Sequence, residues 1–128
     1  WPPLLPSRGL TVTAVDAGDL APSVAADHRV HHVRTTTGAY LRRRSGTVFD
    51  VLVNDMKMDA ETSTALMLEA ARALRPGGLA VLTLKITPRR PAEVVRSALG
   101  RLRSCYEIEF ARQLYHNRNE VTVVARRR

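Results

Sequence analysis

The sequence has few of the residues that stabilise secreted proteins or cross membranes. Cys105 is its only cysteine, so no internal disulfide can form, and no second cysteine or histidine pair lies near it in the sequence to complete a metal site. No apolar run approaches the roughly 20 residues that span a bilayer. The start, Trp1-Pro2-Pro3, has no signal-peptide pattern. We therefore expect a cytoplasmic protein without membrane or metal partners, in which Cys105 is a small core residue.

Methionine is absent from the first position, and lysine is scarce throughout. Because Trp1 and two prolines stand where a first strand would be expected, we expect the natural protein to extend upstream.

Of 20 Lys and Arg residues only Lys57 and Lys85 are lysines, which leaves 18 arginines. A formal net charge of +8 favours phosphate-rich partners, nucleic acid first among them. The alternative for any single arginine is a solvated surface position, and genomic base composition could also explain the excess.

Length and hydrophobic content indicate one domain. The chain has 128 residues, of which 45% are hydrophobic, enough to bury one ordinary core but not two. No feature of the sequence indicates an oligomeric state.

Strands alternate with helices along most of the chain. Short apolar, β-branched segments predict strands over residues 10–15, 30–34, 49–54 and 79–86. A loop is expected at 35–38, followed by an exposed arginine run at 42–44. Asp59 is expected to cap a helix that continues to about Arg75 and is stopped by Pro76-Gly77-Gly78, and Pro91 begins a second helix. This alternation predicts an α/β fold with a mostly parallel sheet.

The C-terminal part predicts an antiparallel hairpin. Two strand segments, 106–114 and 121–125, are separated by a short polar turn at 115–119. Tyr115 and His116 in this turn could contact a nucleobase or simply cover the end of the sheet. Ligands of such sheets bind at the carboxyl ends of the parallel strands. The polar residues expected at that edge are Asp16, Thr36, Thr37, Asp55 and Lys85.

Lys85 is the most informative residue, because it interrupts an apolar strand. A lysine there must reach the edge of the sheet or lie beside an anion. Asp55 is the expected partner, since its strand and that of Lys85 are joined by one helix and should be adjacent. The pair could be only a structural ion pair.

Two other carboxylates allow both structural and functional interpretations. Glu120 begins the final strand, and the hairpin could bring it to the same edge, although such a residue is more often a surface charge. Asp16 could form the turn Asp16-Ala17-Gly18 or hydrogen-bond a nucleoside ribose.

Several motifs together resemble one enzyme family. They are Val15-Asp16, the segment Phe49 to Met56, Leu74-Arg75-Pro76-Gly77-Gly78, Leu82-Thr83-Leu84-Lys85, and the segment Arg112 to Val123. The chain is similar to FtsJ-type RNA ribose methyltransferases, and most similar to the RlmM-like branch that methylates large-subunit ribosomal RNA. The similarity runs from Trp1 to near the C-terminus.

The resemblance implies a fold and a reaction. The fold would be a Rossmann-like S-adenosylmethionine (SAM)-dependent methyltransferase fold with a C-terminal antiparallel hairpin, in which the first strand is missing between the strands that end at Asp16 and Asp55. Residues 1–128 would be a single FtsJ-like methyltransferase domain, incomplete at its N-terminus. The expected activity is transfer of a methyl group from SAM to a ribose 2′-hydroxyl of RNA, with ribosomal RNA as the expected substrate.

The resemblance also assigns residues to roles. The family's Lys-Asp-Lys-Glu tetrad would be represented by Asp55, Lys85 and Glu120, while its first lysine has no counterpart. Lys85 would be the general base, acting when neutral. In a complete site its pKa would be lowered by burial and by the cationic neighbour that is missing here, while Asp55 would orient it and oppose that shift. The expected cofactor-binding residues are Trp1, Asp16, Thr36, Thr37 and Asp55.

Two departures from the family concern cofactor binding. The glycine-rich loop that would precede Trp1 is absent. Many relatives have an aspartate against the adenine amino group where this chain has Thr35-Thr36-Thr37. The alternatives are an inactive methyltransferase-like module that binds RNA or a protein partner, and a methyltransferase for another acceptor, which Lys85 and Glu120 argue against.

Overall fold

The computed structural model describes residues 9–44, 46–113 and 119–128. Trp1, Tyr115 and His116 lie outside these residues. The chain divides into two compact units, Trp1–Ser45 and Gly46–Arg128, each of which is described by itself. That residues 1–128 form a single domain stays a prediction.

The first unit is built on two parallel strands. β1 (Val12–Val15) pairs with β2 (Val30–Val33), and the short helix α2 (Pro22–Ala25) lies between them in the sequence. Both strands were predicted, although β1 begins two residues later than expected. Asp16 follows β1 directly, so its predicted place at the end of a strand is confirmed.

The helix α3 (Thr37–Arg43) is a correction, because the sequence predicted a loop at 35–38. Thr36 caps the helix, since its hydroxyl oxygen accepts a hydrogen bond from the backbone N–H of Ala39 at 3.2 Å. Leu41 is buried and anchors the helix. Arg42 and Arg43, exposed as expected, stand in the last turn, where positive charge complements the helix dipole.

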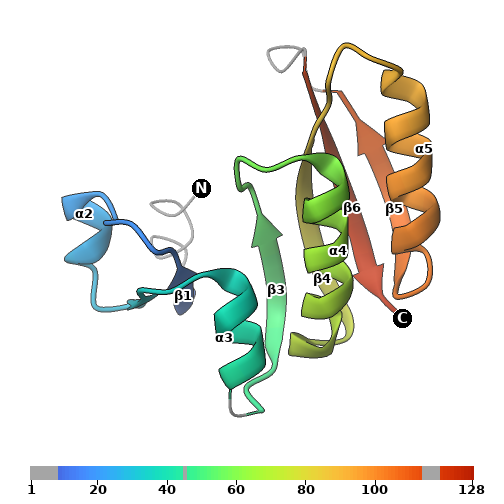
Figure 1. Ribbon diagram of the computed structural model, residues 1–128. Helices are drawn as coiled ribbons and strands as arrows, with labels where there is room; N and C mark the ends of the chain where they lie inside the picture. The colour runs from blue at the N-terminus through green and yellow to red at the C-terminus, as the bar shows by residue number, and fades with distance from the viewer. Residues whose placement is uncertain (1–8, 45, 114–118) are drawn as a thin grey trace. The chain divides into compact units, whose positions relative to one another are not determined.

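The second unit is a four-stranded sheet with strand order β3-β4-β6-β5 (Figure 1). The strands are β3 (Phe49–Asn54), β4 (Leu74–Lys85), β5 (Tyr106–Arg112) and β6 (Glu120–Arg127). β3 and β4 are parallel, whereas β6 runs antiparallel to both of its neighbours. The expected C-terminal antiparallel pair is confirmed, and β6 inserts between β4 and β5.

Helices α4 (Ala60–Ala70) and α5 (Pro91–Leu102) lie side by side along one face of this sheet (Figure 1). Asp59 caps α4 and Pro91 begins α5, as predicted. Alternate residues of β4 and β6 point toward the helices and form the core. This core includes Met67, Leu74, Leu82, Leu84, Ala98, Leu102, Tyr106 and Val123.

The Pro76-Gly77-Gly78 segment is a second correction, because it lies within β4 and does not stop the helix. The helical segment ends earlier, after a 3₁₀ turn at Ala71–Ala73. Between Phe49 and Val51 the partner of β3 changes from Leu74 to Leu79, so β4 bulges here. Gly77 has a φ of +73°, and a Cβ on Gly78 would lie 2.7 Å from Leu74 Cδ1. The glycines therefore serve a bulge that side chains would obstruct.

The described strands form two separate sheets, β1-β2 and β3-β4-β6-β5. No helix of the described residues is long and apolar enough to cross a membrane.

Leu82 tests the position of the core. It is 2% exposed in the centre of β4, so Leu82→Ala should lower the free energy of unfolding by about 2–5 kcal/mol. Val51 on the adjacent strand is 44% exposed, and Val51→Ala should cost less than about 1 kcal/mol. Urea denaturation followed by circular dichroism measures both, and equal losses would contradict this core.

Candidate active site

The predicted charged residues meet at the carboxyl end of β3 and β4. Lys85 is the last residue of β4, and Asp55 comes directly after β3. Glu120 is the first residue of β6 and is paired in register with Lys85. Because β6 is antiparallel to β4, its amino end lies at the carboxyl end of β4, which brings Glu120 to the same edge.

Lys85 contacts both carboxylates. Its Nζ donates a hydrogen bond to Glu120 Oε1 and lies 3.7 Å from Asp55 Oδ1. The side chains of Lys85 and Glu120 are each 27% exposed, and that of Asp55 is 47% exposed. The expected Lys85–Asp55 pair is therefore present, but Glu120 is the closer partner. All three side chains remain accessible to a ligand.

The carboxylates set the charge state of the lysine. The hydrogen bond to Glu120 raises the pKa of Lys85 above its usual value, burial opposes this shift, and the charge of Asp55 adds to it. The lowering of this pKa that is expected for a site with a further cationic neighbour stays a prediction. Burial is only partial here, so the two anions outweigh desolvation, and Lys85 is an ammonium group at neutral pH.

Asn54 fixes the loop that carries Asp55. Its side chain is buried, where Nδ2 donates to Ser63 Oγ at 3.1 Å and Oδ1 accepts from the backbone N–H of Met56 at 3.1 Å. One amide thus links the end of β3 to α4 and to the residue after Asp55. A buried polar group satisfied in this way resists movement.

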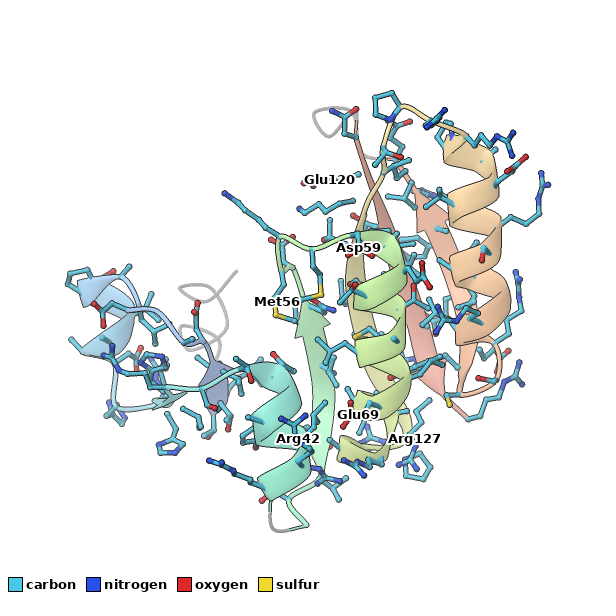
Figure 2. The ribbon with its side chains drawn as sticks, in the orientation of Figure 1. Arg42, Met56, Asp59, Glu69, Glu120 and Arg127 are labelled. Carbon is cyan, nitrogen blue, oxygen red and sulfur yellow. The ribbon has the colours of Figure 1, made fainter. Side chains whose placement is uncertain are left out.

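A pocket of about 500 Å³ opens beside Lys85. Its lining consists of Lys57, Met58, Asp59, Lys85, Ile86, Thr87 and Glu120. In Figure 2, Met56, Asp59 and Glu120 gather at this end of the second unit, whereas Glu69 and Arg127 lie toward the opposite end. The site therefore occupies the sheet edge at which ligands of α/β proteins bind.

The sequence analysis missed Asp59 and Lys57 as residues of this pocket. Asp59 was interpreted only as a helix cap, and its carboxylate does accept the backbone N–H of Thr62 at 2.8 Å, which lowers its pKa. It also forms a backbone bridge with Lys85. The signal was available, since both residues follow closely after a strand that ends at the ligand edge.

The residues expected to hold the cofactor nucleoside belong to the first unit. Asp16 Oδ1 accepts the backbone N–H of Gly18 at 2.8 Å, so the turn interpretation holds. The residue is exposed, which leaves its carboxylate open to ribose hydroxyls as well. The Thr36 hydroxyl is engaged as the cap of α3, and Thr37 is the first residue of that helix.

The polar side chains that are expected to bind the cofactor fit a nucleoside in part. An exposed carboxylate at a strand end suits a ribose, and Asp55 lies beside Lys85, but a capping Thr36 has less capacity to accept from an adenine amino group. Within the described residues no group of three or more His, Cys, Asp or Glu side chains is placed to hold a metal ion.

Solved structures with a similar fold include methyltransferases. Fibrillarin from Methanococcus jannaschii, a pre-rRNA processing protein, matches 90% of this chain and 55% of its own at 15% identity and a TM-score of 0.69. Fibrillarin from Aeropyrum pernix with bound SAM matches 88% and 54% at 18% identity and a TM-score of 0.64. The 1,6-didemethyltoxoflavin-N1-methyltransferase of Burkholderia thailandensis, with S-adenosylhomocysteine bound, matches 98% and 64% at 16% identity and 0.69. The chain thus has the Rossmann-like fold of SAM-dependent methyltransferases, as expected.

Sequence comparison with curated proteins finds closer relatives, although no family model matches. Ribosomal RNA large subunit methyltransferase M of Halorhodospira halophila is 43% identical over 127 residues, which are 99% of this chain and 36% of that protein. The protein of the same name from Alkalilimnicola ehrlichii is 34% identical over 98% of this chain and 34% of its own length. The chain spans about a third of the length of these relatives. Over the part that they share, the chain is homologous to the proteins named ribosomal RNA large subunit methyltransferase M.

Proposed function

We propose that this chain carries the catalytic residues of an enzyme that transfers a methyl group from SAM to a ribose 2′-hydroxyl of RNA, with large-subunit ribosomal RNA as substrate. The observation that carries the proposal is Lys85, held between Glu120 and Asp55 at the ligand edge of a methyltransferase fold. The name of the relatives supports ribosomal RNA as the substrate. A cytoplasmic location belongs to the same proposal, because ribosomal RNA is available there.

The reaction needs alignment and removal of one proton. SAM supplies an electrophilic methyl group on a sulfonium sulfur. The bond between the ribose 2′-oxygen and this methyl carbon forms as the methyl–sulfur bond breaks, and the hydroxyl proton must go to the protein or to water. Positioning of the two reactants provides a large part of the rate of such transfers.

Lys85 and Glu120 are placed to bind the hydroxyl. A protonated Lys85 donates to the 2′-oxygen but cannot accept its proton, so Lys85 acts as general base only in the molecules in which it is neutral. Glu120 accepts from the hydroxyl or from Lys85 and orients both. Asp55 holds the lysine from the other side. The methyl-transfer rate should therefore rise with pH.

The cofactor contacts follow the same proposal. Asp16 would bind the ribose of SAM, Thr36 and Thr37 would lie near its adenine, Trp1 would lie near the glycine loop that precedes it in relatives, and Asp55 would lie near its methionine end. The support is the open carboxylate of Asp16 and the accessible edge beside Asp55.

A second candidate is a catalytically inactive module that binds RNA through its arginines. The protonated state of Lys85 and the net charge of +8 favour it. This candidate predicts salt-sensitive RNA binding without methyl transfer, which separates it from the first.

Methyl transfer tests the proposed function. The 128-residue chain and a version extended upstream through its preceding coding sequence are incubated with labelled SAM and large-subunit ribosomal RNA. We expect transfer to a 2′-hydroxyl by the extended chain, and a loss of at least about a hundredfold in Lys85→Ala, since general bases typically contribute 10²–10⁴-fold. Arg101→Ala, which removes an exposed cation that does not line the pocket beside Lys85, is the control and should retain the rate. Absence of transfer by both chains, or full activity of Lys85→Ala, would refute the proposal.

The two lysines allow a direct test of the charge state. In a chain labelled only at lysine side chains, NMR titration should show Lys85 losing its proton at higher pH than an ordinary lysine. Glu120→Gln removes the principal cause, so the pKa of Lys85 should fall, and the rising limb of the pH–rate profile should move to lower pH. Asp55→Asn should shift it less. A Lys85 signal that titrates below an ordinary lysine in the unmodified chain would contradict this geometry.

A further inference from the structure

A second groove, of about 470 Å³, lies within the second unit and is separate from the pocket of Lys85. It runs along α5 from Pro91 to Arg103. Its floor is apolar and is formed by Ile86, Val95, Leu99 and Val121, and Arg96 and Arg103 line it as well. This volume is in the range of small-ligand sites.

The groove adjoins the pocket beside Lys85 at one residue, Ile86, which follows the end of β4. Ile86 lines both the groove and the pocket beside Lys85. Glu120 and Val121 are consecutive residues of β6 and point to opposite faces of the sheet, so Glu120 lines the pocket and Val121 lines the groove. A chain bound with one unit at Lys85 can therefore continue past Ile86 into the groove.

The charges of the groove have one sign. No acidic residue is part of its described lining. Arg96 and Arg103 are seven residues apart, almost two helical turns, so both point to the same side of α5 about 10 Å apart along its axis. Both are exposed. An apolar floor beside two arginines on one line complements a ligand with flat apolar groups and regularly spaced negative charges.

We propose that this groove binds the single-stranded RNA that flanks the methylated nucleotide. A base or ribose next to the target lies on the apolar floor, and phosphates of the same strand pair with Arg96 and Arg103. Single strands combine stackable bases with one negative charge per nucleotide. The bases match the apolar floor of the groove, and the phosphates match its two arginines. The contacts add affinity and align the target, and they involve no chemical step.

This inference rests on the proposed function for the identity of the nucleotide at Lys85, but it is tested by binding. Fluorescence anisotropy is measured with a labelled single-stranded RNA of 12 nucleotides and the 128-residue chain. The double variant Arg96→Ala/Arg103→Ala should bind roughly tenfold more weakly, equivalent to about 1.4 kcal/mol. The slope of log affinity against log salt should fall by about 1.4, the value for two lost phosphate contacts on a single strand.

Arg101 provides the matched control. It lies on the same helix, is exposed and carries the same charge, but it does not line the groove. Arg101→Ala should therefore reduce affinity much less than either groove arginine. If Arg101→Ala weakens binding as much as Arg96→Ala, the effect is one of net charge and the groove proposal is overturned.

A second pair of variants adds charge without removing an arginine. Ala92 lines the groove and is exposed in the first turn of α5, so Ala92→Glu should fold and should repel phosphate. Ser97 is exposed on another side of the helix, and Ser97→Glu should have little effect. Equal effects of the two glutamates would count against the groove.

Two further readouts distinguish this proposal from others. Polyglutamate that competes as well as unlabelled RNA would assign the groove to an acidic protein and overturn the inference. If the groove variants bind RNA normally while Lys85→Ala abolishes methyl transfer, the groove proposal fails and the proposed function stands. If RNA binding depends on Arg96 and Arg103 but no methyl transfer occurs, the groove stands and the proposed function fails.

Discussion

The pairing of β6 with β4 is the constraint on which the candidate site depends. Its register sets Glu120 opposite Lys85, and the parallel pairing of β3 with β4 brings Asp55 to the other side. A lysine at the end of an apolar strand needs anions nearby, and the pairing of β3, β4 and β6 supplies them. A shift of β6 by one residue would turn Glu120 to the opposite face and would also remove Val121, Val123 and Ala125 from the core.

Most of the fold could be predicted from the alternation of apolar strands with capped helices, because β-branched runs and the Asp59 and Pro91 caps are local signals. Helix α3 and the bulge in β4 could not be predicted in this way. The helix α3 is only seven residues long and contains Gly38, so its helix propensity is weak. The segment that includes its capping residue Thr36 was interpreted as a loop. The bulge at Gly77 and Gly78 depends on pairing with β3 across the sheet, which no local pattern reveals.

The site was predictable for a different reason. Carboxyl ends of parallel strands meet at one edge, so Asp55 and Lys85 were expected together, and the hairpin brought Glu120 to them. The sequence could not show which carboxylate is closer or how far Lys85 is buried, and these two quantities decide its charge. The protonated Lys85 follows from partial burial beside two anions. The pocket and the groove that meet at Ile86 extend this edge into a surface long enough for a polymer.

In the proposed function, Asp55, Lys85 and Glu120 act as one unit in methyl transfer. A double-mutant cycle tests it most directly, with single-turnover transfer rates measured for Asp55→Asn, Glu120→Gln and the double variant in the extended chain. Because both carboxylates act through Lys85, the loss in the double variant should be clearly smaller than the product of the two single losses. Losses that multiply would mean that the two carboxylates act independently, and they would contradict their joint action through Lys85.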